Sequence, residues 1–400
     1  MDKISLIFIF QAAGLVMGAL FGLLTKHLNR QLMLTALLTM MSVASLLIPW
    51  SQRLSHLYLY NGIFGMGAGA WINAKNVWTI ELWQHRSAPV LQLSALMFGV
   101  GSILGPLIDD PYLIGHIKQL TVIDNTPIDG LTGAVGNDSA GSFDVNVTVI
   151  EDQRLHNVRS PFVICAIIQI IGPILLIIMY FLRKYEKGGD KYMEIEDRAD
   201  IERKATIARI PYLKFSIIAL VSLFLAFHMS SEQNTQQFSA TFFQDIQMKL
   251  TASKSAEVVS AMAVANTVGL AVSVLVSAVG VRPQYMITYH LLFIFAGLNI
   301  LFLDETSELL LYVGSLLLSY GFSAVYPAVF ALASRYIDVT DTIGTVFMVS
   351  SVVLNLFLPF VIGLYIEVYV YVLLVSIAAN LAITVIVFIF LQQLINKYCK

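Results

Sequence analysis

The stretch that decides the fold is residues 61–83, NGIFGMGAGAWINAKNVWTIELW. It is long and apolar enough to be a helix, yet it has four glycines in its first half and carries asparagines and a lysine. A helix advances about 100° per residue. One face of it then holds Asn61, Gly65, Gly69, Ile72, Asn76 and Thr79, with Lys75 at the edge. Such a narrow small and polar stripe predicts the inner wall of a helical bundle rather than a surface that faces lipid.

The whole chain has the composition of an integral membrane protein. Of its 400 residues, 57% are hydrophobic and 12% are charged, and the mean hydropathy is +0.76. A net charge of −2 gives no reason to expect a nucleic-acid partner. The two cysteines, Cys165 and Cys399, lack metal-ligand neighbours. Since no phosphate-binding loop or catalytic triad is evident either, we expect a protein of the lipid bilayer that needs no cofactor and is not an enzyme.

The hydropathy pattern predicts an all-α polytopic fold with eleven membrane-spanning helices, each long enough to cross a bilayer. They are 4–25, 31–50, 56–82, 90–108, 159–182, 212–232, 256–280, 285–303, 308–333, 342–364 and 368–394. The charged segment 183–211 divides them five and six. We therefore expect an N-terminal half (1–182), a cytoplasmic linker (183–211) and a C-terminal half (212–400). Because transporters commonly have six helices in each half, we also expect that a first helix is absent from the N-terminal half.

Lysine and arginine predict the orientation in the membrane, because they concentrate on the cytoplasmic side. With the C-terminus inside, the short inner loops and the tail hold seven of them, residues 183–214 hold nine more, and the short outer segments hold four. The loop 109–158 is then extracellular. It contains the two N-glycosylation sequons of the chain, at Asn137 and Asn146. We expect an integral protein of the plasma membrane with a cytoplasmic C-terminus.

Two parts of the sequence resemble a known family, and a third matches it in part. The first holds Asn76-Val77, Leu82-Trp83, Pro89, Leu91-Gln92, Phe98, Gly101 and Gly105-Pro106-Leu107; the second holds Gly321, Tyr326-Pro327, Arg335-Tyr336-Ile337, Val339-Thr340, Pro359 and Gly363. These resemble the major facilitator superfamily, in particular its sodium-dependent glucose transporter-like branch (major facilitator superfamily domain-containing protein 4) and, more distantly, the fucose permeases. In the loop 22–31, Gly22, Asn29 and Arg30 fit part of the superfamily's Gly-x-x-x-Asp-x-x-Gly-Arg pattern.

The resemblance implies the fold of that superfamily and secondary transport of a small polar solute, in the first place a hexose such as glucose. It would proceed by alternating access between two helical halves. Three departures weaken the case for an ion as a coupling partner. Relatives have an acid, a histidine and an acid where this chain has Ile72, Ala95 and Asn355. We therefore expect transport that depends little on Na⁺ or on a proton gradient, although Na⁺ is the one candidate ion.

Six polar residues are candidates for binding the solute: Asn61, Lys75, Asn76, Glu232, Asn234 and Gln236. Their amides and carboxylate could hydrogen-bond the hydroxyls of a sugar, with Phe238, Phe242 or Phe243 as stacking surfaces. Each has a structural alternative. The asparagines could bond neighbouring helices, and the polar run 230–237 could mark the end of a helix that has left the membrane. Pro106, Pro327 and Pro359 are expected to mark kinks.

Lys75 leaves three interpretations open. Its ammonium could reach the cytoplasmic interface along its flexible stem. It could pair with Glu232, or it could attract an anionic solute, because a lone charge at depth is costly. Two other functions therefore stand beside hexose transport. One is a carrier of organic anions such as monocarboxylates that uses Lys75, and the other is a sensor or scaffold that keeps the fold without transporting.

The sequence makes one topological prediction that can be tested directly. Asn137 and Asn146 should carry glycans, and a tag at Lys400 should be reachable only after the plasma membrane is permeabilised. Glycosidase treatment should increase the electrophoretic mobility of the wild-type protein, and it should leave the double variant Asn137→Gln, Asn146→Gln unchanged. A tag at Lys400 that binds antibody on intact cells would overturn the orientation.

Overall fold

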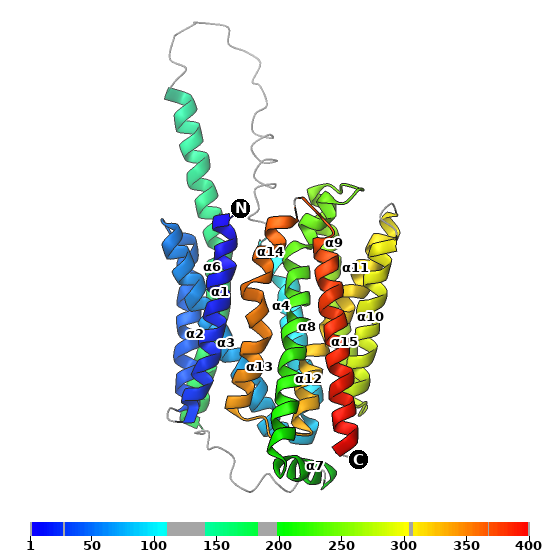
Figure 1. Ribbon diagram of the computed structural model, residues 1–400. Coiled ribbons are helices and arrows are strands. Elements are labelled where there is room, and N and C mark those ends of the chain that lie inside the picture. The colour runs from blue at the N-terminus through cyan, green and yellow to red at the C-terminus, as the bar shows by residue number, and fades with distance from the viewer. Residues whose placement is uncertain are drawn as a thin grey trace, which may run out of the picture.

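The computed structural model is a bundle of long helices that run side by side (Figure 1). It describes residues 2–26, 29–109, 141–182, 198–303, 307–366 and 368–398. Over these residues, ten helical spans are long and apolar enough to cross a membrane. The helix α3 (Leu54–Trp83), with 30 residues, accounts for the remaining predicted segment. Every predicted segment therefore has a helical counterpart, and the all-α membrane fold is confirmed.

The helices before residue 183 are here termed the N-terminal helices. They are α1 (Asp2–Leu20), α2 (Arg30–Leu47), α3, α4 (Ser87–Asp109) and α6 (Gly141–Leu182), with the short 3₁₀ turns η1 (Phe21–Lys26), η2 (Ile48–Trp50) and η3 (Gln84–Arg86). The helices after residue 197 are termed the C-terminal helices. They are α7 (Arg198–Ala208), α8 (Pro211–Asp245), α9 (Ala252–Ala278), α10 (Pro283–Leu303), α11 (Glu308–Ser323), α12 (Val325–Ser334), α13 (Asp341–Val353), η6 (Leu354–Leu356), α14 (Leu358–Tyr365) and α15 (Val372–Tyr398). That the two groups work as separate halves stays a prediction.

The two ends of the chain lie at opposite ends of the bundle. In Figure 1 the start of α1 is at the upper end, and the end of α15 is at the lower end, beside α7. We use "upper end" and "lower end" in this sense. A chain whose two termini lie at opposite ends of the bundle crosses the membrane an odd number of times, which agrees with the predicted eleven spans. Which end faces the cytoplasm stays a prediction, and so does glycosylation, because Asn137 lies outside the described residues and only the helical backbone is described at Asn146.

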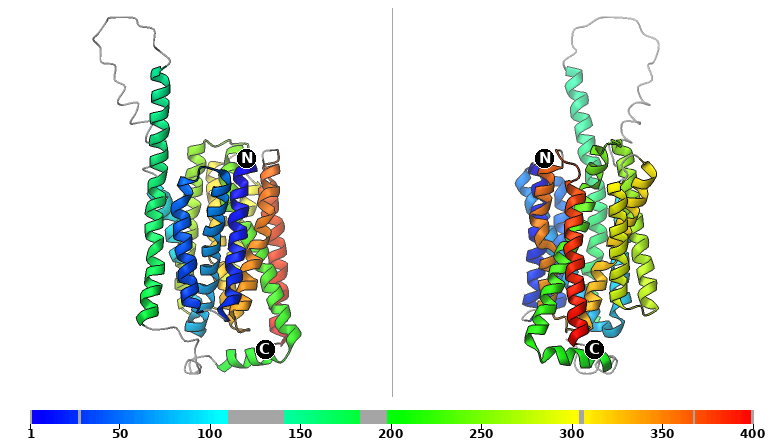
Figure 2. Two further views of the ribbon diagram at one scale, coloured as in Figure 1. Left: turned by 90° about the vertical axis from the view of Figure 1, so that its left-hand side faces the viewer. Right: turned by 45° about the vertical axis from the view of Figure 1, so that its right-hand side comes forward.

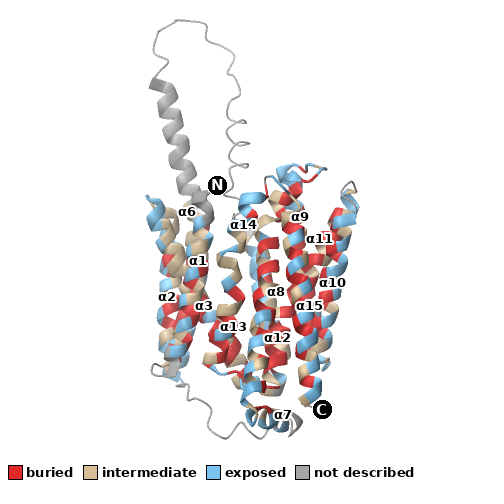
Figure 3. Ribbon diagram, viewed as in Figure 1, coloured by how far each residue is buried: buried red, intermediate tan, exposed pale blue. Residues whose placement is uncertain are grey.

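The C-terminal helices contain the largest part of the hydrophobic core. Figure 3 shows many buried residues on α8 and α12. Among the N-terminal helices, α6 packs mainly on α2, and Figure 2 shows it at the edge of the bundle. On α4, a Cβ added at Gly101 or Gly105 would meet no atom within 4 Å. The N-terminal helices thus have an open side, and the expectation of a further helix on that side stays a prediction.

Two spans are interrupted near prolines, as expected. The first is broken at Ala324, between α11 and α12, three residues before Pro327. The second passes from α13 through η6 into α14, where Pro359 occupies the first turn. Proline cannot donate a backbone hydrogen bond and clashes with the preceding turn, which accounts for both interruptions. At Pro106, where a kink is also expected, the helix is not interrupted, because α4 continues to Asp109.

The predicted end of the span 212–232 is wrong. α8 continues without interruption to Asp245, so the polar run 230–237 lies inside a helix of 35 residues. Hydropathy placed the boundary too early because it scores polarity and not direction. Several of these polar side chains, such as Ser230, Asn234 and Thr235, are buried against other helices. The run is therefore not the end of the helix, and its depth in the membrane stays a prediction.

The glycine stripe of α3 faces α1. A Cβ added at Gly65 would lie 2.2 Å from the carbonyl oxygen of Gln11, and one at Gly69 would lie 2.2 Å from that of Leu15. Small residues let two helix backbones approach closely, and in a membrane this close packing takes the place of the hydrophobic effect. The stripe is therefore a helix–helix contact in the protein interior, away from lipid as predicted. Its glycine part lines no cavity.

This contact predicts that Gly69→Ala destabilises the protein and that Gly101→Ala does not. Both substitutions replace glycine within a helix, which favours the helix by about 1 kcal/mol. Only at Gly69 does the new methyl group meet a backbone atom. The resulting overpacking should cost about 1–3 kcal/mol or more. Thermal unfolding in detergent should show a lower Tm for Gly69→Ala alone, and equal values for both variants would contradict the contact.

Candidate functional site

Polar side chains from three elements meet in the interior of the bundle. The Asn76 amide, on the buried face of α3, donates a hydrogen bond to the Tyr326 hydroxyl of α12 at 3.2 Å. That hydroxyl lies 3.8 Å from the sulfur of Met348 on α13 and donates to it. Asn76 precedes the linker and Tyr326 follows it, so this contact joins the N-terminal and C-terminal helices. We refer to Asn76, Tyr326 and Glu232 as the central site.

Glu232 comes to the central site from α8. α8 packs against α12, which carries Tyr326, and the Glu232 carboxylate accepts a hydrogen bond from Gln236 at 3.4 Å. Asn234, two residues further along α8, is fully buried, and its amide donates a hydrogen bond to the Ser230 hydroxyl at 3.2 Å. Asn234 therefore bonds within α8, whereas Glu232 and Gln236 are the candidates on this helix that can reach a solute.

The structure agrees neither with Lys75 reaching the cytoplasmic interface nor with its pairing with Glu232. Its ammonium donates to the Ser94 hydroxyl of α4 at 3.2 Å. The bond from Cα to Cβ tilts toward the start of a helix, which for α3 is the upper end, so the stem of Lys75 leads away from the lower end. In the part of the chain that the structure describes, it forms no ion pair with Glu232. Lys75 thus lies inside the bundle with a neutral partner.

Asn61 does not belong to the central site. Its amide donates to the backbone carbonyl of Leu57, one turn earlier in α3, at 2.8 Å. It also lies 15 residues before Asn76, which at about 1.5 Å per residue is about 22 Å along the helix. The structure therefore favours the structural alternative for Asn61.

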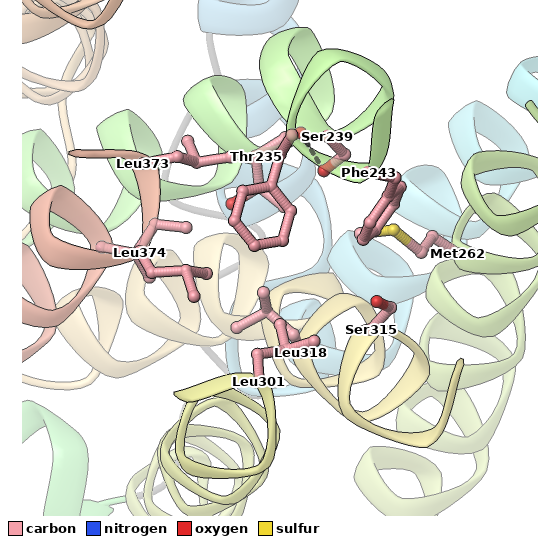
Figure 4. A pocket seen from close by; sticks show the side chains of 11 residues that line it. Thr235, Ser239, Phe243, Met262, Leu301, Ser315, Leu318, Leu373 and Leu374 are labelled. Atoms are coloured by element: carbon pink, nitrogen blue, oxygen red, sulfur yellow. Dashed lines mark hydrogen bonds between the residues drawn. The ribbon is translucent and has the colours of Figure 1, made fainter. Parts of the chain in front are cut away.

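The predicted stacking surfaces also fail in part. Phe242 and Phe243 are buried and line a small apolar pocket among the C-terminal helices (Figure 4). That pocket has room for about one water molecule, so it is too small for a sugar. Phe238 is half-buried and stays a candidate.

A cluster of charged residues lies at the lower end, and sequence reasoning missed it. The Arg30 guanidinium, at the start of α2, bonds the Glu81 carboxylate of α3 at 2.8 Å and also pairs with Asp341 at the start of α13. It lies 5.6 Å from the centre of the Trp78 ring. Arg30 and Asp341 are both buried. This Arg30 cluster ties the N-terminal helices to α13 and closes the bundle between them.

A second contact lies beside the Arg30 cluster. The buried Asn73 amide donates to the Thr345 hydroxyl of α13 at 3.0 Å and to the carbonyl of Ala19 at 3.3 Å. The sequence offered one signal for these contacts, the partial match at Arg30. It offered none for their partners, since Arg30 and Asp341 are 311 positions apart.

Comparison with known proteins gives a consistent result. Residues 153–359 match the family described as Major Facilitator Superfamily. The mouse protein named sodium-dependent glucose transporter 1A is 23% identical over 367 residues, which cover 91% of this chain and 81% of that protein. Major facilitator superfamily domain-containing protein 4A of Xenopus tropicalis is 22% identical over 401 residues, covering 91% and 78%.

The fold is also similar to a solved structure. The crystal structure of the fucose:proton symporter FucP of E. coli superposes with a TM-score of 0.62 at 15% sequence identity, over 98% of this chain and 97% of that one. At this level of identity the similarity concerns the fold alone. It agrees with the predicted resemblance, which the family match confirms.

The Arg30 cluster predicts that Arg30→Ala opens the lower end. Loss of the arginine leaves two carboxylates together without a cation, and breaking a buried ion pair typically costs about 3–5 kcal/mol. Val77, fully buried beside Gly344 of α13, can report the change as a single cysteine, with Cys165 and Cys399 replaced by serine. A water-soluble thiol reagent should label Val77→Cys at least about tenfold faster in the Arg30→Ala background.

Asp338→Ala is the matched control for this experiment. It removes an ion pair with Lys204 at 3.3 Å, in which Asp338 is 75% exposed. Exposed pairs contribute little, so labelling should stay at the wild-type rate. Equal labelling in the wild type and in Arg30→Ala would show that the cluster does not close the lower end.

Proposed function

The chain belongs to the Major Facilitator Superfamily, whose members are transporters and not enzymes, and on that premise we propose that it carries a small polyhydroxylated solute, in the first place a hexose such as glucose. The N-terminal and C-terminal helices would act as two halves that rock against each other around the central site. The observation that carries the proposal is the central site itself. Asn76, Tyr326 and Glu232 bring donors and acceptors from both groups of helices to one place in the membrane interior.

The chemistry of the central site suits hydroxyl groups. An amide offers two donors and an acceptor, a phenol offers one of each, and a carboxylate accepts. Polar groups within a membrane bundle are costly unless they are paired, so they commonly mark the path of a solute. In the structure the Asn76 amide donates to the Tyr326 hydroxyl, and that hydroxyl donates to the Met348 sulfur. A bound sugar would replace these neutral contacts with its own at little net cost.

The orientation is part of the proposal. If the lower end is cytoplasmic, as the lysines and arginines predict, the Arg30 cluster closes the bundle toward the cytoplasm. The structure would then correspond to the state in which the central site is reached from outside. The plasma membrane is the proposed location, with the sequons on the outer side.

Two of the similar proteins are named for the sugar and the ion that they transport. The mouse protein is named sodium-dependent glucose transporter 1A, and FucP is described as a fucose:proton symporter. These names support a sugar as the solute. For this chain we propose weak dependence on Na⁺, because Ile72 offers no oxygen to a cation and Asn355 cannot titrate. The predicted pairing of Lys75 with Glu232 is not formed, because the Lys75 ammonium donates to Ser94 instead.

One observation favours a second candidate function. Lys75 lies in the bundle with only a neutral hydroxyl as its partner among the described residues, and a buried cation is stabilised by an anion. A carrier of organic anions would supply that anion at each turnover. Lys75→Gln would then abolish the uptake of lactate, whereas a hexose carrier should tolerate it.

Uptake by proteoliposomes tests the proposal. We expect uptake of labelled glucose that falls less than about twofold when choline replaces Na⁺ at fixed pH, because Ile72 and Asn355 stand where the relatives have acids. A severalfold loss in choline would overturn the Na⁺ prediction. Labelled lactate, measured in parallel, tests the anion alternative. If neither solute moves, the sensor or scaffold function is the one that survives.

Two asparagines of α3 provide a matched pair of variants. Asn76→Ala should raise the KM for the sugar about five- to a hundredfold, because it removes an amide from the central site. Asn61→Ala removes an amide whose bond stays within α3, so its KM should remain within about twofold of the wild type. Equal effects of the two variants would remove Asn76 from the binding site.

A further inference from the structure

The break between α11 and α12 has a feature that the proposed function does not use. α11 ends at Ser323, and Ala324 has a non-helical backbone (φ −107°, ψ 1°). Pro327 has no N–H to offer the Ser323 carbonyl, so the helix cannot continue its own hydrogen bonds through this point. Carbonyls at a break inside a membrane protein need donors from neighbouring helices.

Two of these donors come from the C-terminal helices themselves. The Asn266 amide of α9 donates to the Ser319 carbonyl at 3.3 Å. The His290 ring of α10 lies with Nδ1 3.2 Å from the Tyr320 carbonyl oxygen. These contacts connect elements on the same side of the linker. They therefore hold the break whether or not the two groups of helices move relative to each other.

A third donor comes from the other group of helices. The Gln92 amide of α4 donates to the Ala324 carbonyl at 3.1 Å, as a second donor beside the backbone N–H of Ala328, which bonds the same oxygen at 3.1 Å. Gln92 is 1% exposed, and its side-chain oxygen has no hydrogen-bond partner. The Asn73 and Asn234 amides also have an unpaired oxygen, and what distinguishes Gln92 is that its bond reaches the break from α4. An amide that exchanges partners between two arrangements of the protein would be half-satisfied in one of them.

The Gln92 bond depends on how the two groups of helices are placed. α12 is almost completely buried and packs against α4, α8 and α10. Two amides of the N-terminal helices bond its first residues, Gln92 at Ala324 and Asn76 at the Tyr326 hydroxyl. A movement of α4 relative to α12 would break the Gln92 bond and leave the Asn266 and His290 bonds intact.

We propose that Gln92 is a positioning residue that couples the broken helix to the transport cycle, by holding the α11–α12 break only while the lower end is closed. An interaction made in one of two states favours that state by its own free energy. A neutral hydrogen bond shifts such a ratio about two- to tenfold. This inference rests on the proposed rocking of the two halves, and it adds a residue that sets the balance between the two states.

The distance between two spin labels at the lower end tests the proposal. Arg86→Cys, in η3, and Asn396→Cys, near the end of α15, place one exposed label on each group of helices, with Cys165 and Cys399 replaced by serine. Arg30→Ala, which should populate the open lower end, identifies the longer distance. Gln92→Leu keeps the side-chain volume but removes the donor, and we expect the ratio of long to short distances to rise about two- to tenfold.

Asn266→Leu is the matched control. It removes an amide bond to the same broken helix, but within the C-terminal helices, so it should lower the Tm without changing the distance ratio. Gln92→Met replaces Gln92→Leu if the latter folds poorly. An unchanged ratio in the Gln92 variants, a fall in it, or an equal rise in Asn266→Leu would overturn the role of Gln92.

The same measurement distinguishes a failure of this inference from a failure of the proposed alternating-access transport on which it rests. If Arg30→Ala and the wild type give one and the same distance, the two groups do not rock, and alternating access fails together with the role of Gln92. If Arg30→Ala changes the distance and the Gln92 variants do not, only the role of Gln92 falls.

Discussion

The hydrocarbon interior of a membrane offers no hydrogen-bond partners, and this constraint governs the polar residues of the chain. Each polar side chain carried into the bundle must find its partner on its own helix or on a neighbour. Asn61 satisfies the requirement within its own helix. The amides of Asn73, Asn76 and Gln92 donate hydrogen bonds across the boundary between N-terminal and C-terminal helices. The same chemistry that makes these residues expensive in lipid therefore ties the two groups of helices together.

The contacts across that boundary differ in strength. At the lower end, the Arg30 cluster contains buried charges, and the loss of one member leaves the others uncompensated. At the central site and at the broken helix, the bonds are neutral and each contributes about 1 kcal/mol. A strong contact at one end and weak contacts in the middle suit a protein that stays closed at that end while polar groups in its centre exchange partners with a solute.

The sequence predicted the helices well, because long apolar runs have few alternatives in a membrane. It failed at α8, where inward-facing polar residues such as Asn234 resemble a helix end to a hydropathy scale. It also failed to find the partners of Arg30. No sequence pattern indicated that Glu81 and Asp341 are the partners of Arg30. Contacts between residues hundreds of positions apart follow from packing, which periodicity within one helix cannot supply.

The close approach of α1 and α3 has a consequence for how the protein is made. Both helices start at the upper end (Figure 1), with α2 between them in sequence, so the partner of α1 is synthesised two spans later. The contact depends on backbone against backbone at Gly65 and Gly69, and neither helix can form it with lipid. The contact can therefore form only after α3 has entered the membrane, so α1 is inserted before its main packing partner exists.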